Sequence, residues 1–571
     1  MKLETKLISS LGKIFPDEIK GDALLRATLL KNEAFSFQVA FKNADGFKDV
    51  VRLYLRVETD LDICLVSQYS EGCIPVTRAD VPDSDGYFER KTAGLYPDVL
   101  FERKTNTELI DCGLPWLPIW TEQDQTHLLE SSAESYRGLW FTVNEMGEVI
   151  PSGKYYIRVL FFDAGNRECI GEETLELEVI EASLPKQTLG YTSWFHCDCL
   201  ADTYGEEIFS DRFFEIMRSY VSLAAKHGMN TILLPAFTPP LDTPFGKERK
   251  TAQLVCVTAC GGEYSFDFSL MRKYIDICRK CGIEKFEHSH LFTQWGAQYA
   301  PKIMAWVDGE EKRIFGWETD SQSSEYDEFL RAYLRALRAF LEEMQLKDRI
   351  MFHVSDEPSI SHIEAYENAV DLVCSELDGY TCCDALSDFD FYKKGYVKRP
   401  IVAVGSPDME DFINNCEDLW VYYTGGELTD NLPNHTISVP SARNRVLGLQ
   451  MYVGKAKGFL HWGYNYYYGA LSRGLFNPLT DPCGYKQFAG ASYIVYPDIR
   501  GKALPSIRMK VFYEAINDYG ALQLLEGLVG RDAVLVFIEK IVGKVTYRYS
   551  PTNCELFEFR QKLNEEIAKN L

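Results

Sequence analysis

Residues 349–379 read RIMFHVSDEPSISHIEAYENAVDLVCSELDG: a short apolar run, two adjacent carboxylates, then apolar residues at helical spacing. The run is typical of a buried strand, and the segment after Pro358 is typical of an amphipathic helix. The same order recurs from Gly190 onward, with further helix patterns such as FFEIMRSYVSLAAKHG (213–228) and YDEFLRAYLRALRAFLEEM (326–344). This alternation indicates a parallel sheet covered by helices.

Candidate strands in this region number eight. They are YTSWFH (191–196), NTILLPAF (230–237), IEKFEHSHLF (283–292), RIMFHVS (349–355), YTCCDAL (380–386), PIVAVG (400–405), LWVYYT (419–424) and GFLHWGYN (458–465). Eight parallel strands close a (β/α)8 TIM-like barrel, although the same alternation also fits an open doubly wound sheet. No glycine-rich phosphate turn follows the first strand, as a dinucleotide fold would require. The sequence therefore favours the barrel, an α/β fold.

Strand patterns fill the chain before the barrel. SFQVAFK (36–42), VVRLYLRVE (50–58), GLWFTVN (138–144), KYYIRVLFFDA (154–164) and ETLELEVIEA (173–182) alternate apolar and polar residues between turn signals. Such a series predicts an antiparallel β-sandwich. We therefore predict an N-terminal β-sandwich at 1–186, a catalytic barrel at 187–500 and a helical or mixed C-terminal extension, packed on the barrel, at 501–571.

The charge balance limits the partners. The 571 residues include 84 acidic and 60 basic side chains, a formal net charge of −24. This charge repels nucleic-acid phosphates and anionic lipids. The N-terminal residues lack the apolar core of a signal peptide, and no apolar run is long enough to span a membrane. We therefore predict a cytoplasmic protein with neither a nucleic-acid nor a membrane partner.

Cysteine and histidine patterns give little indication of a metal. The 16 cysteines are scattered through apolar segments, as reduced core residues are. Cys278 and Cys281 form one CxxC spacing without the second pair of a zinc site, and His288 and His290 have no third ligand at recognisable spacing. We predict neither a metal nor a cofactor.

Functional side chains gather at the carboxyl ends of the predicted strands, where the loops of a barrel surround one pocket. The candidates are Trp194, His196, His290, Trp295, Asp356, Glu357, Asp384, Tyr422, Tyr423, Trp462, Tyr464 and Asn465. Aromatic rings for stacking, with carboxylates and amides for hydroxyl groups, are typical of a sugar site. Each aromatic residue also fits simple packing, and the two acids also fit a helix N-terminus.

The stretch FHVSDEPS (352–359) resembles the catalytic motif of glycoside hydrolase family 123, whose described activity is β-N-acetylgalactosaminidase. LFTQWGAQYAPKI (291–303), GFLHWGYNYY (458–467) and YIVYPDIRGKALPSIRMKVFYEAINDY (493–519) also resemble that family. The turn before YIVYP departs from it, because 490–492 read GAS without the acid usual in the relatives. The resemblance implies that Glu357 is the general acid/base and that Asp356 orients the substrate amide.

Adjacent acids suit one mechanism better than another. Their Cα atoms lie about 3.8 Å apart, so they do not easily straddle a sugar as nucleophile and acid. They suit substrate-assisted, retaining catalysis, in which the 2-acetamido oxygen of the sugar attacks C1 and close like charges keep Glu357 protonated. Together with the family resemblance, this predicts an exo-acting hexosaminidase that releases a terminal β-linked N-acetylgalactosamine or related sugar from an oligosaccharide or glycoconjugate. The alternatives are a glycosidase for a sugar without an acetamido group, with Asp384 as partner, and a non-catalytic carbohydrate-binding protein.

Overall fold

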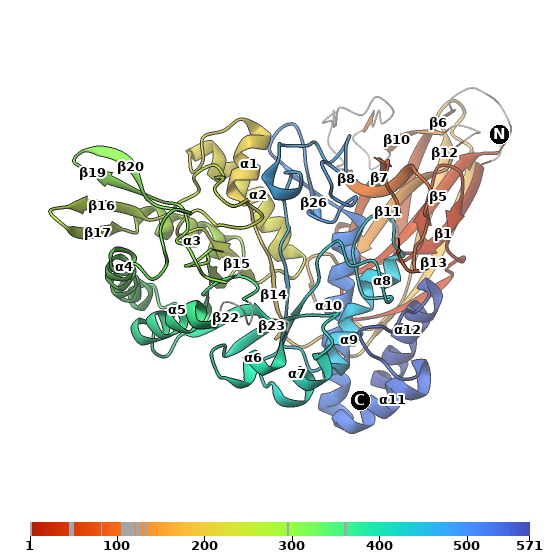
Figure 1. Cartoon of the computed structure of the whole chain (residues 1–571). Coiled ribbons are helices and arrows are strands. Elements are labelled where there is room, and N and C mark those ends of the chain that lie inside the picture. The colour runs from red at the N-terminus through yellow and green to blue at the C-terminus, as the bar shows by residue number, and fades with distance from the viewer. Residues whose placement is uncertain are drawn as a thin grey trace.

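The structure, a computed structural model, describes residues 3–44, 51–80, 83–103, 120–121, 127–131, 135–293, 296–358, 363–386 and 388–571. Figure 1 shows strand layers from the N-terminal third of the chain on one side and a barrel on the other. Helices from the last part of the chain lie between them (Figure 1).

Two packed sheets form the N-terminal part. Their strand orders are β1-β5-β11-β7-β8 and β4-β13-β12-β6-β10-β9. Among the described strands, pairing in both sheets is antiparallel except between β13 and β4. Phe37, Phe141 and Leu175 belong to the apolar core between the sheets. The strands are β1 (Leu3–Ser9), β4 (Arg26–Leu30), β5 (Phe35–Asn43), β6 (Val51–Thr59), β7 (Val66–Val76), β8 (Gly94–Glu102), β9 (Trp120–Thr121), β10 (His127–Ser131), β11 (Arg137–Val143), β12 (Gly153–Asp163) and β13 (Cys169–Ile180), beside the short pair β2 (Lys13–Ile14) and β3 (Ile19–Lys20).

The middle part is a closed barrel of parallel strands, which confirms the predicted barrel against the open sheet. In barrel order the strands are β14 (Gly190–Ser193), β15 (Thr231–Leu234), β18 (Lys285–His288), β21 (Ile350–His353), β22 (Thr381–Leu386), β23 (Arg399–Ala403), β24 (Trp420–Tyr422) and β25 (Gly458–His461). The first strand, β14, pairs in parallel with the last, β25, so the sheet closes on itself.

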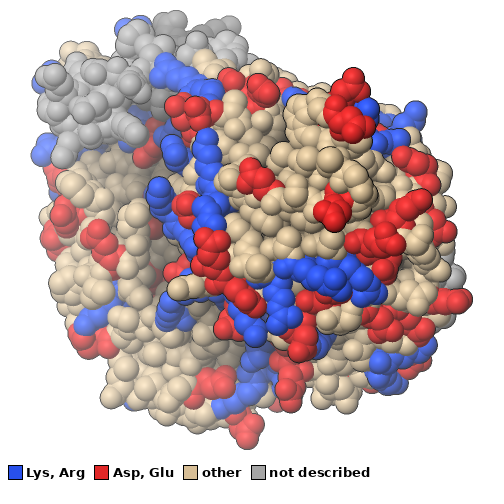
Figure 2. All heavy atoms as spheres, turned by 90° about the vertical axis from the view of Figure 1, so that its left-hand side faces the viewer, with Lys and Arg blue, Asp and Glu red and all other residues tan. Residues whose placement is uncertain are grey.

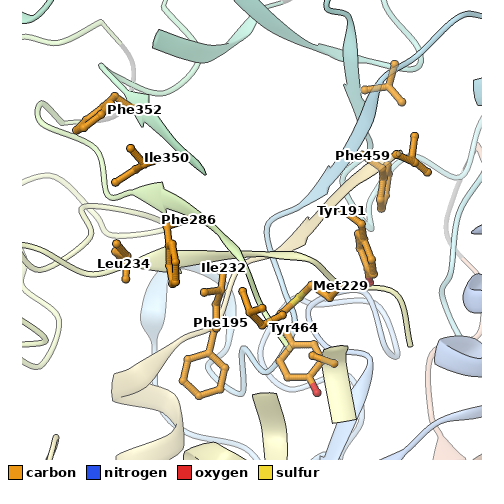
Figure 3. Close-up of a cluster of buried hydrophobic side chains, with 14 of the residues drawn as sticks. Tyr191, Phe195, Met229, Ile232, Leu234, Phe286, Ile350, Phe352, Phe459 and Tyr464 are labelled. Carbon is orange, nitrogen blue, oxygen red and sulfur yellow. The ribbon is translucent and has the colours of Figure 1, made fainter. Parts of the chain in front are cut away.

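Successive residues of a barrel strand face opposite sides of the barrel wall. On the outer side, Ile232, Phe286 and Phe352 of neighbouring strands join one apolar layer (Figure 3). On the inner side, Leu233 and Met351 pack together in the barrel interior. The outer layer is covered by helices, among them α1 (Cys197–Tyr204), α2 (Asp211–Lys226), α3 (Ser269–Lys280), α4 (Ser324–Glu343), α5 (Ile363–Glu376), α6 (Phe389–Lys393), α7 (Met409–Asn415), α8 (Ser441–Arg445) and α9 (Leu447–Val453).

A small sheet that the sequence reading missed projects from the barrel (Figure 1). It consists of β16 (Cys256–Cys260), β17 (Glu263–Asp267), β19 (Ile303–Val307) and β20 (Glu310–Phe315). Its two hairpins turn at Gly261-Gly262 and at Asp308-Gly309, where all four φ angles are positive. Gly-Gly and Asp-Gly are the usual residues of such two-residue turns, so the signal was present in the sequence.

The C-terminal helices bridge the other two parts. They are α10 (Ile507–Val529), α11 (Arg531–Val542) and α12 (Asn553–Lys569), preceded by the hairpin β26 (Val495–Pro497) and β27 (Ala503–Pro505). Phe512 of α10 lies 4.9 Å from Tyr191 and 5.1 Å from Phe459, between ring centroids. Helix α10 therefore covers the first and last barrel strands, although it follows the predicted boundary at residue 500. Helix α12 contacts β4, where Gln561 accepts a hydrogen bond from the Thr28 backbone N–H.

Charges of both signs are interleaved on the face that carries α4 (Figure 2). Arg331 of α4, for example, pairs with Asp327 of the same helix and with Glu376 of α5. Within the described ranges, no helix is both long enough and apolar enough to cross a membrane.

Candidate active site

A cavity of about 340 Å³ opens at the carboxyl ends of the barrel strands. Six of the predicted residues line it: Trp194, His196, Asp356, Glu357, Tyr422 and Trp462. The predicted site residues do not include the other lining residues, among which are Asp242, His353, Gln487 and Ala491. Ala491 belongs to the GAS turn, so that turn contributes to the cavity wall without an acid.

The acid pair lies directly after β21. Asp356 is partly buried and Glu357 is exposed. Glu357 has a φ of 46°, in the left-handed region that a non-glycine residue rarely adopts, and such strain is concentrated at functional sites. The Tyr422 hydroxyl donates a hydrogen bond to Glu357 Oε1 at 2.9 Å, so a residue of β24 fixes one carboxylate oxygen across the cavity.

The two acids of the pair lie in different electrostatic surroundings. Burial and the neighbouring Glu357 charge raise the pKa of Asp356 to about 7, and the His353 charge works in the opposite direction. The sequence predicts the raised pKa at Glu357, whereas the structure raises that of Asp356, the more buried of the two. Near neutral pH the pair therefore exchanges one proton with solvent.

Glu287 fixes two groups of the cavity wall from inside the barrel. Its carboxylate accepts hydrogen bonds from Trp194 Nε1 at 2.6 Å and from Thr192 Oγ1 at 3.0 Å. It also accepts one from His353 Nε2. Trp194 and His353 line the cavity, so Glu287 determines the position of both rings. The sequence offered only a lone acid within KFEHSH.

His196 has both ring nitrogens engaged. Arg249 donates to its Nδ1 at 3.1 Å, so the proton lies on Nε2, which donates to the Trp462 carbonyl at 2.7 Å. Burial and Arg249 lower the pKa of His196 to about 3, so the ring is neutral. Arg249 is in turn paired with Asp198 at 2.7 Å. His196 therefore contributes a ring surface to the cavity.

Asp242 is a further carboxylate of the cavity wall. It follows β15 and has a φ of 44°. Its Oδ2 accepts hydrogen bonds from the Tyr466 hydroxyl and, at 2.9 Å, from the Leu471 backbone N–H. These contacts tie the loop after β15 to the loop after β25 beside the cavity. No sequence pattern marked this residue.

Two predicted contact residues lie behind the cavity wall. Asp384 follows Cys383, which faces the barrel interior, so its own side chain leaves on the outer side. It is 1% exposed and accepts hydrogen bonds from the backbone N–H groups of Val354 and Ser355 at 3.0 and 3.1 Å. His290 is buried, with its ring stacked at 4.4 Å on that of His353. Neither residue lines the cavity.

Three more predicted residues are engaged elsewhere, and one is not described. The Tyr423 hydroxyl bonds His435 Nδ1 at 2.8 Å, because Tyr423 faces away from the side that Tyr422 faces. The Tyr464 hydroxyl donates to the Tyr220 carbonyl at 2.8 Å. Asn465 accepts from the His196 backbone N–H at 2.8 Å and so positions His196. Trp295 lies outside the described residues.

The two histidines considered for a metal lie on opposite sides of the wall. His288 bonds the Tyr333 hydroxyl of α4 at 2.7 Å through Nε2 and its neighbour's carbonyl at 2.6 Å through Nδ1. In the part of the chain that the structure describes, no group of three or more His, Cys, Asp or Glu side chains could hold a metal ion.

Comparison with protein families gives one match. Residues 194–525 match the family described as Glycoside hydrolase 123, catalytic domain. This span runs from the cavity residue Trp194 into helix α10 and covers more than half of the chain. No protein with a curated description matches the sequence.

Among solved structures, a family 123 glycoside hydrolase from Clostridium perfringens, studied for glycolipid glycan hydrolysis, is similar over 100% of this chain and 98% of its own. The TM-score is 0.72 at 13% sequence identity, so the likeness concerns the fold. The endo-1,4-beta-D-xylanase 10B of Clostridium thermocellum has a TM-score of 0.33 at 10% identity, over 91% of this chain and 100% of that one. A Rhizomucor miehei family 5 mannosidase has a TM-score of 0.33 at 14% identity, over 63% of this chain and 95% of that one.

Proposed function

Because the chain belongs to glycoside hydrolase family 123, its substrates are glycans, and we propose that it is an exo-acting, retaining β-N-acetylgalactosaminidase or related hexosaminidase. In this proposal the 2-acetamido group of the substrate is the nucleophile. The observation that supports it most directly is the pair Asp356 and Glu357, adjacent in sequence and lining one cavity. Adjacent carboxylates cannot easily attack C1 from one face and protonate the leaving oxygen from the other.

The first chemical step divides the work between the two acids. Glu357 gives its proton to the glycosidic oxygen as the bond from C1 to that oxygen breaks. The acetamido oxygen forms a bond to C1, which gives an oxazolinium intermediate. Asp356 accepts a hydrogen bond from the amide N–H and balances the positive charge that develops there. In the second step water gives a proton to Glu357 and replaces the acetamido oxygen at C1, so the configuration is retained.

Substrate binding also brings the proton to the required acid. Without ligand, the raised pKa of Asp356, about 7, favours a proton on that residue in mildly acidic solution. An amide N–H donated to Asp356 favours its carboxylate form, because hydrogen bonding to the charged form lowers a pKa. The proton of the pair then belongs to Glu357, which needs it for the leaving group.

The cavity is suited to one terminal sugar. Its volume of about 340 Å³ lies at the lower end of the range of ligand pockets, about 300 to 1,000 Å³. Trp194 and Trp462 provide aromatic surfaces for the apolar faces of a sugar or for the acetamido methyl group. A small pocket supports removal of a chain-terminal residue more than cleavage within a polymer.

The alternative mechanism needs a protein nucleophile, and the structure changes the candidate for it. Asp384, which the sequence predicts as the partner acid in this alternative, is buried. It accepts hydrogen bonds from Val354, Ser355 and Tyr366. Asp242 is the remaining carboxylate on the cavity wall among the described residues. A glycosidase for sugars without an acetamido group would have to use Asp242 in that role.

A panel of chromogenic glycosides with and without a 2-acetamido group tests the proposal. We expect turnover of β-linked N-acetylgalactosaminides or N-acetylglucosaminides and no turnover of the matching galactosides and glucosides. A 2-fluoro glycoside, analysed by intact mass and peptide mapping, provides the opposing test. A covalent adduct on Asp242 would overturn substrate assistance and support the alternative, and failure to hydrolyse any glycoside would support a carbohydrate-binding role.

A further inference from the structure

A histidine lies between two buried carboxylates at the inner end of the cavity. His353 Nε2 donates to Glu287, and His353 Nδ1 lies 3.6 Å from Asp384 Oδ1. The side chains of these three residues are at most 2% exposed. His353 itself lines the cavity with Asp356. A buried ion cluster of this kind needs its charges balanced, because an unpaired buried charge is costly.

Both carboxylates accept hydrogen bonds that favour their ionised form, although burial raises the pKa of Asp384. Glu287 accepts from Thr192 and Trp194, and Asp384 accepts from two backbone N–H groups and the Tyr366 hydroxyl. No Lys or Arg is found among the described residues that line the cavity. Among the described residues, the ion pairs of Glu287 and Asp384 are both formed with His353. Although burial opposes the charge, the Glu287 and Asp384 side chains on either side of the ring favour it, and the pKa of His353 lies well above its usual value.

We propose that His353 is a positioning residue that carries a permanent positive charge beside Asp356 and thereby determines which member of the acid pair holds the proton. This inference rests on the proposed function. It assigns a role to His353, which lies outside the acid pair: His353 keeps Asp356 ionised while Glu357 holds the proton in the active form.

Among the described residues with the largest effects on Asp356, His353 is the positive one. Glu357, Asp384 and Glu287 all disfavour a charge on Asp356, and His353 favours it. Loss of the His353 charge would raise the pKa of the pair and move negative charge from Asp356 to Glu357. Below the pKa of the pair, the active form, with Asp356 ionised and Glu357 protonated, would then become rarer.

His290 offers a matched control because it lies against the same ring. Its ring stacks on that of His353 at 4.4 Å, but neither of its nitrogens has a hydrogen-bond partner within the described part of the chain. Burial and the His353 charge lower the pKa of His290 well below its usual value, so this ring is neutral. Its replacement removes a ring of equal size and no charge.

The first experiment measures the charge of His353 in the unmodified protein. With nine histidines in the chain, selective imidazole labelling and NMR give a tractable spectrum, and H353Q identifies the signal by its loss. We expect His353 to be an imidazolium at about pH 7 and His290 to be neutral. E287Q, which keeps the shape and removes one carboxylate, should lower the pKa of His353 and also identifies its signal if H353Q does not fold. A neutral His353 at about pH 7 would overturn the proposal.

The second experiment compares the pH profiles of kcat/KM for the unmodified enzyme, H353Q and H290Q. The alkaline limb reports loss of the proton that the pair shares, so H353Q should move it upward by about one to three pH units, the usual effect of a nearby opposite charge. H290Q should leave the pH of the alkaline limb unchanged, even where the value of kcat/KM differs from that of the unmodified enzyme. Equal limbs in H353Q and the unmodified enzyme, or equal shifts in both variants, would contradict the proposal.

The two proposals fail in different ways. A charged His353 together with turnover of glycosides that lack an acetamido group would reject substrate assistance and leave the charge assignment intact. A neutral His353 together with strict dependence on the acetamido group would reject the charge assignment and leave substrate assistance intact.

Discussion

Glu357 and Asp356 are chemically similar side chains that the protein places in different surroundings. Glu357 is exposed, in a left-handed backbone conformation, and bonded to Tyr422 across the cavity. Asp356 is partly buried, close to His353 and to three other carboxylates. Two acids whose environments differ in this way are suited to different roles in acid–base catalysis.

Glu357→Gln should have its largest effect on substrates with poor leaving groups. The amide cannot donate the proton that the glycosidic oxygen needs, so natural glycosides should lose about 100-fold or more in kcat, the usual value of general acid catalysis. An activated aryl glycoside, whose leaving group needs little protonation, should lose much less. Steady-state kinetics on both substrate types decides the question, and equal losses would argue against the acid role.

Asp356→Asn should weaken catalysis and binding of a thiazoline analogue of the intermediate together. The amide has a similar size but cannot balance the positive charge at the acetamido nitrogen, so we expect a loss of about 100-fold in kcat/KM. Inhibition constants for the thiazoline, measured with circular dichroism as a check of folding, test this. An unchanged thiazoline affinity would remove Asp356 from the proposed role.

Between elements, a close backbone approach occurs where α9 meets α10. A Cβ atom added at Gly448 of α9 would lie 2.0 Å from the Ala515 carbonyl oxygen of α10. Glycine at this position therefore allows the two helices to pack backbone against backbone. Because α10 also covers β14 and β25, the spacing between these helices bears on the barrel wall.

Gly448→Ala should destabilise the protein by about 1 to 3 kcal/mol, the usual cost of forcing extra atoms into a packed contact. Gly527→Ala, on the open side of the same helix α10 with no atom within 4 Å of the added Cβ, is the matched control. It should be neutral or stabilising by up to about 1 kcal/mol, because alanine has the higher helix propensity. Urea unfolding curves compare the two, and equal effects would contradict the packing argument.

At the scale of the whole molecule, the described part of the sandwich supports the cavity without lining it. Among the described residues, the cavity walls come from Trp194 onward. Buried ion pairs nevertheless cross the boundary: Asp98 with Arg508, Glu145 with Lys510 and Asp85 with Arg443. Arg508 also donates to the Gly490 and Tyr493 carbonyls, on either side of Ala491 in the cavity wall.

Asp98→Asn should destabilise the protein by about 3 to 5 kcal/mol, because it leaves the Arg508 guanidinium buried without its counter-charge. The matched control is Glu176→Gln, which breaks an ion pair with Arg26 whose two side chains are 64% and 81% exposed. Such exposed pairs contribute about 0 to 1 kcal/mol. Thermal unfolding of both variants tests the difference. Similar midpoints for the two would show that the sandwich contributes little to the stability of the barrel.

The sequence by itself determined the barrel, because the features that specify it are local. Each strand is a short apolar run and each helix repeats its apolar residues at helical spacing, so both can be read within some twenty residues. The small sheet was missed although its Gly-Gly and Asp-Gly turns were visible, because its strands lie inside loops between barrel elements. The acid pair could also be located, because it follows directly after one such strand.

Only the tertiary structure decided which side chains meet. Tyr422 lines the cavity and Tyr423 does not, because a shift of one residue in a strand reverses the side that a residue faces. Glu287 lies on β18 and Asp242 in the loop after β15, whereas the acid pair follows β21, and no spacing in the chain relates them to it. The charge of His353 likewise depends on carboxylates from two neighbouring strands. Burial and long-range pairing set these properties, and both exist only once the barrel has closed.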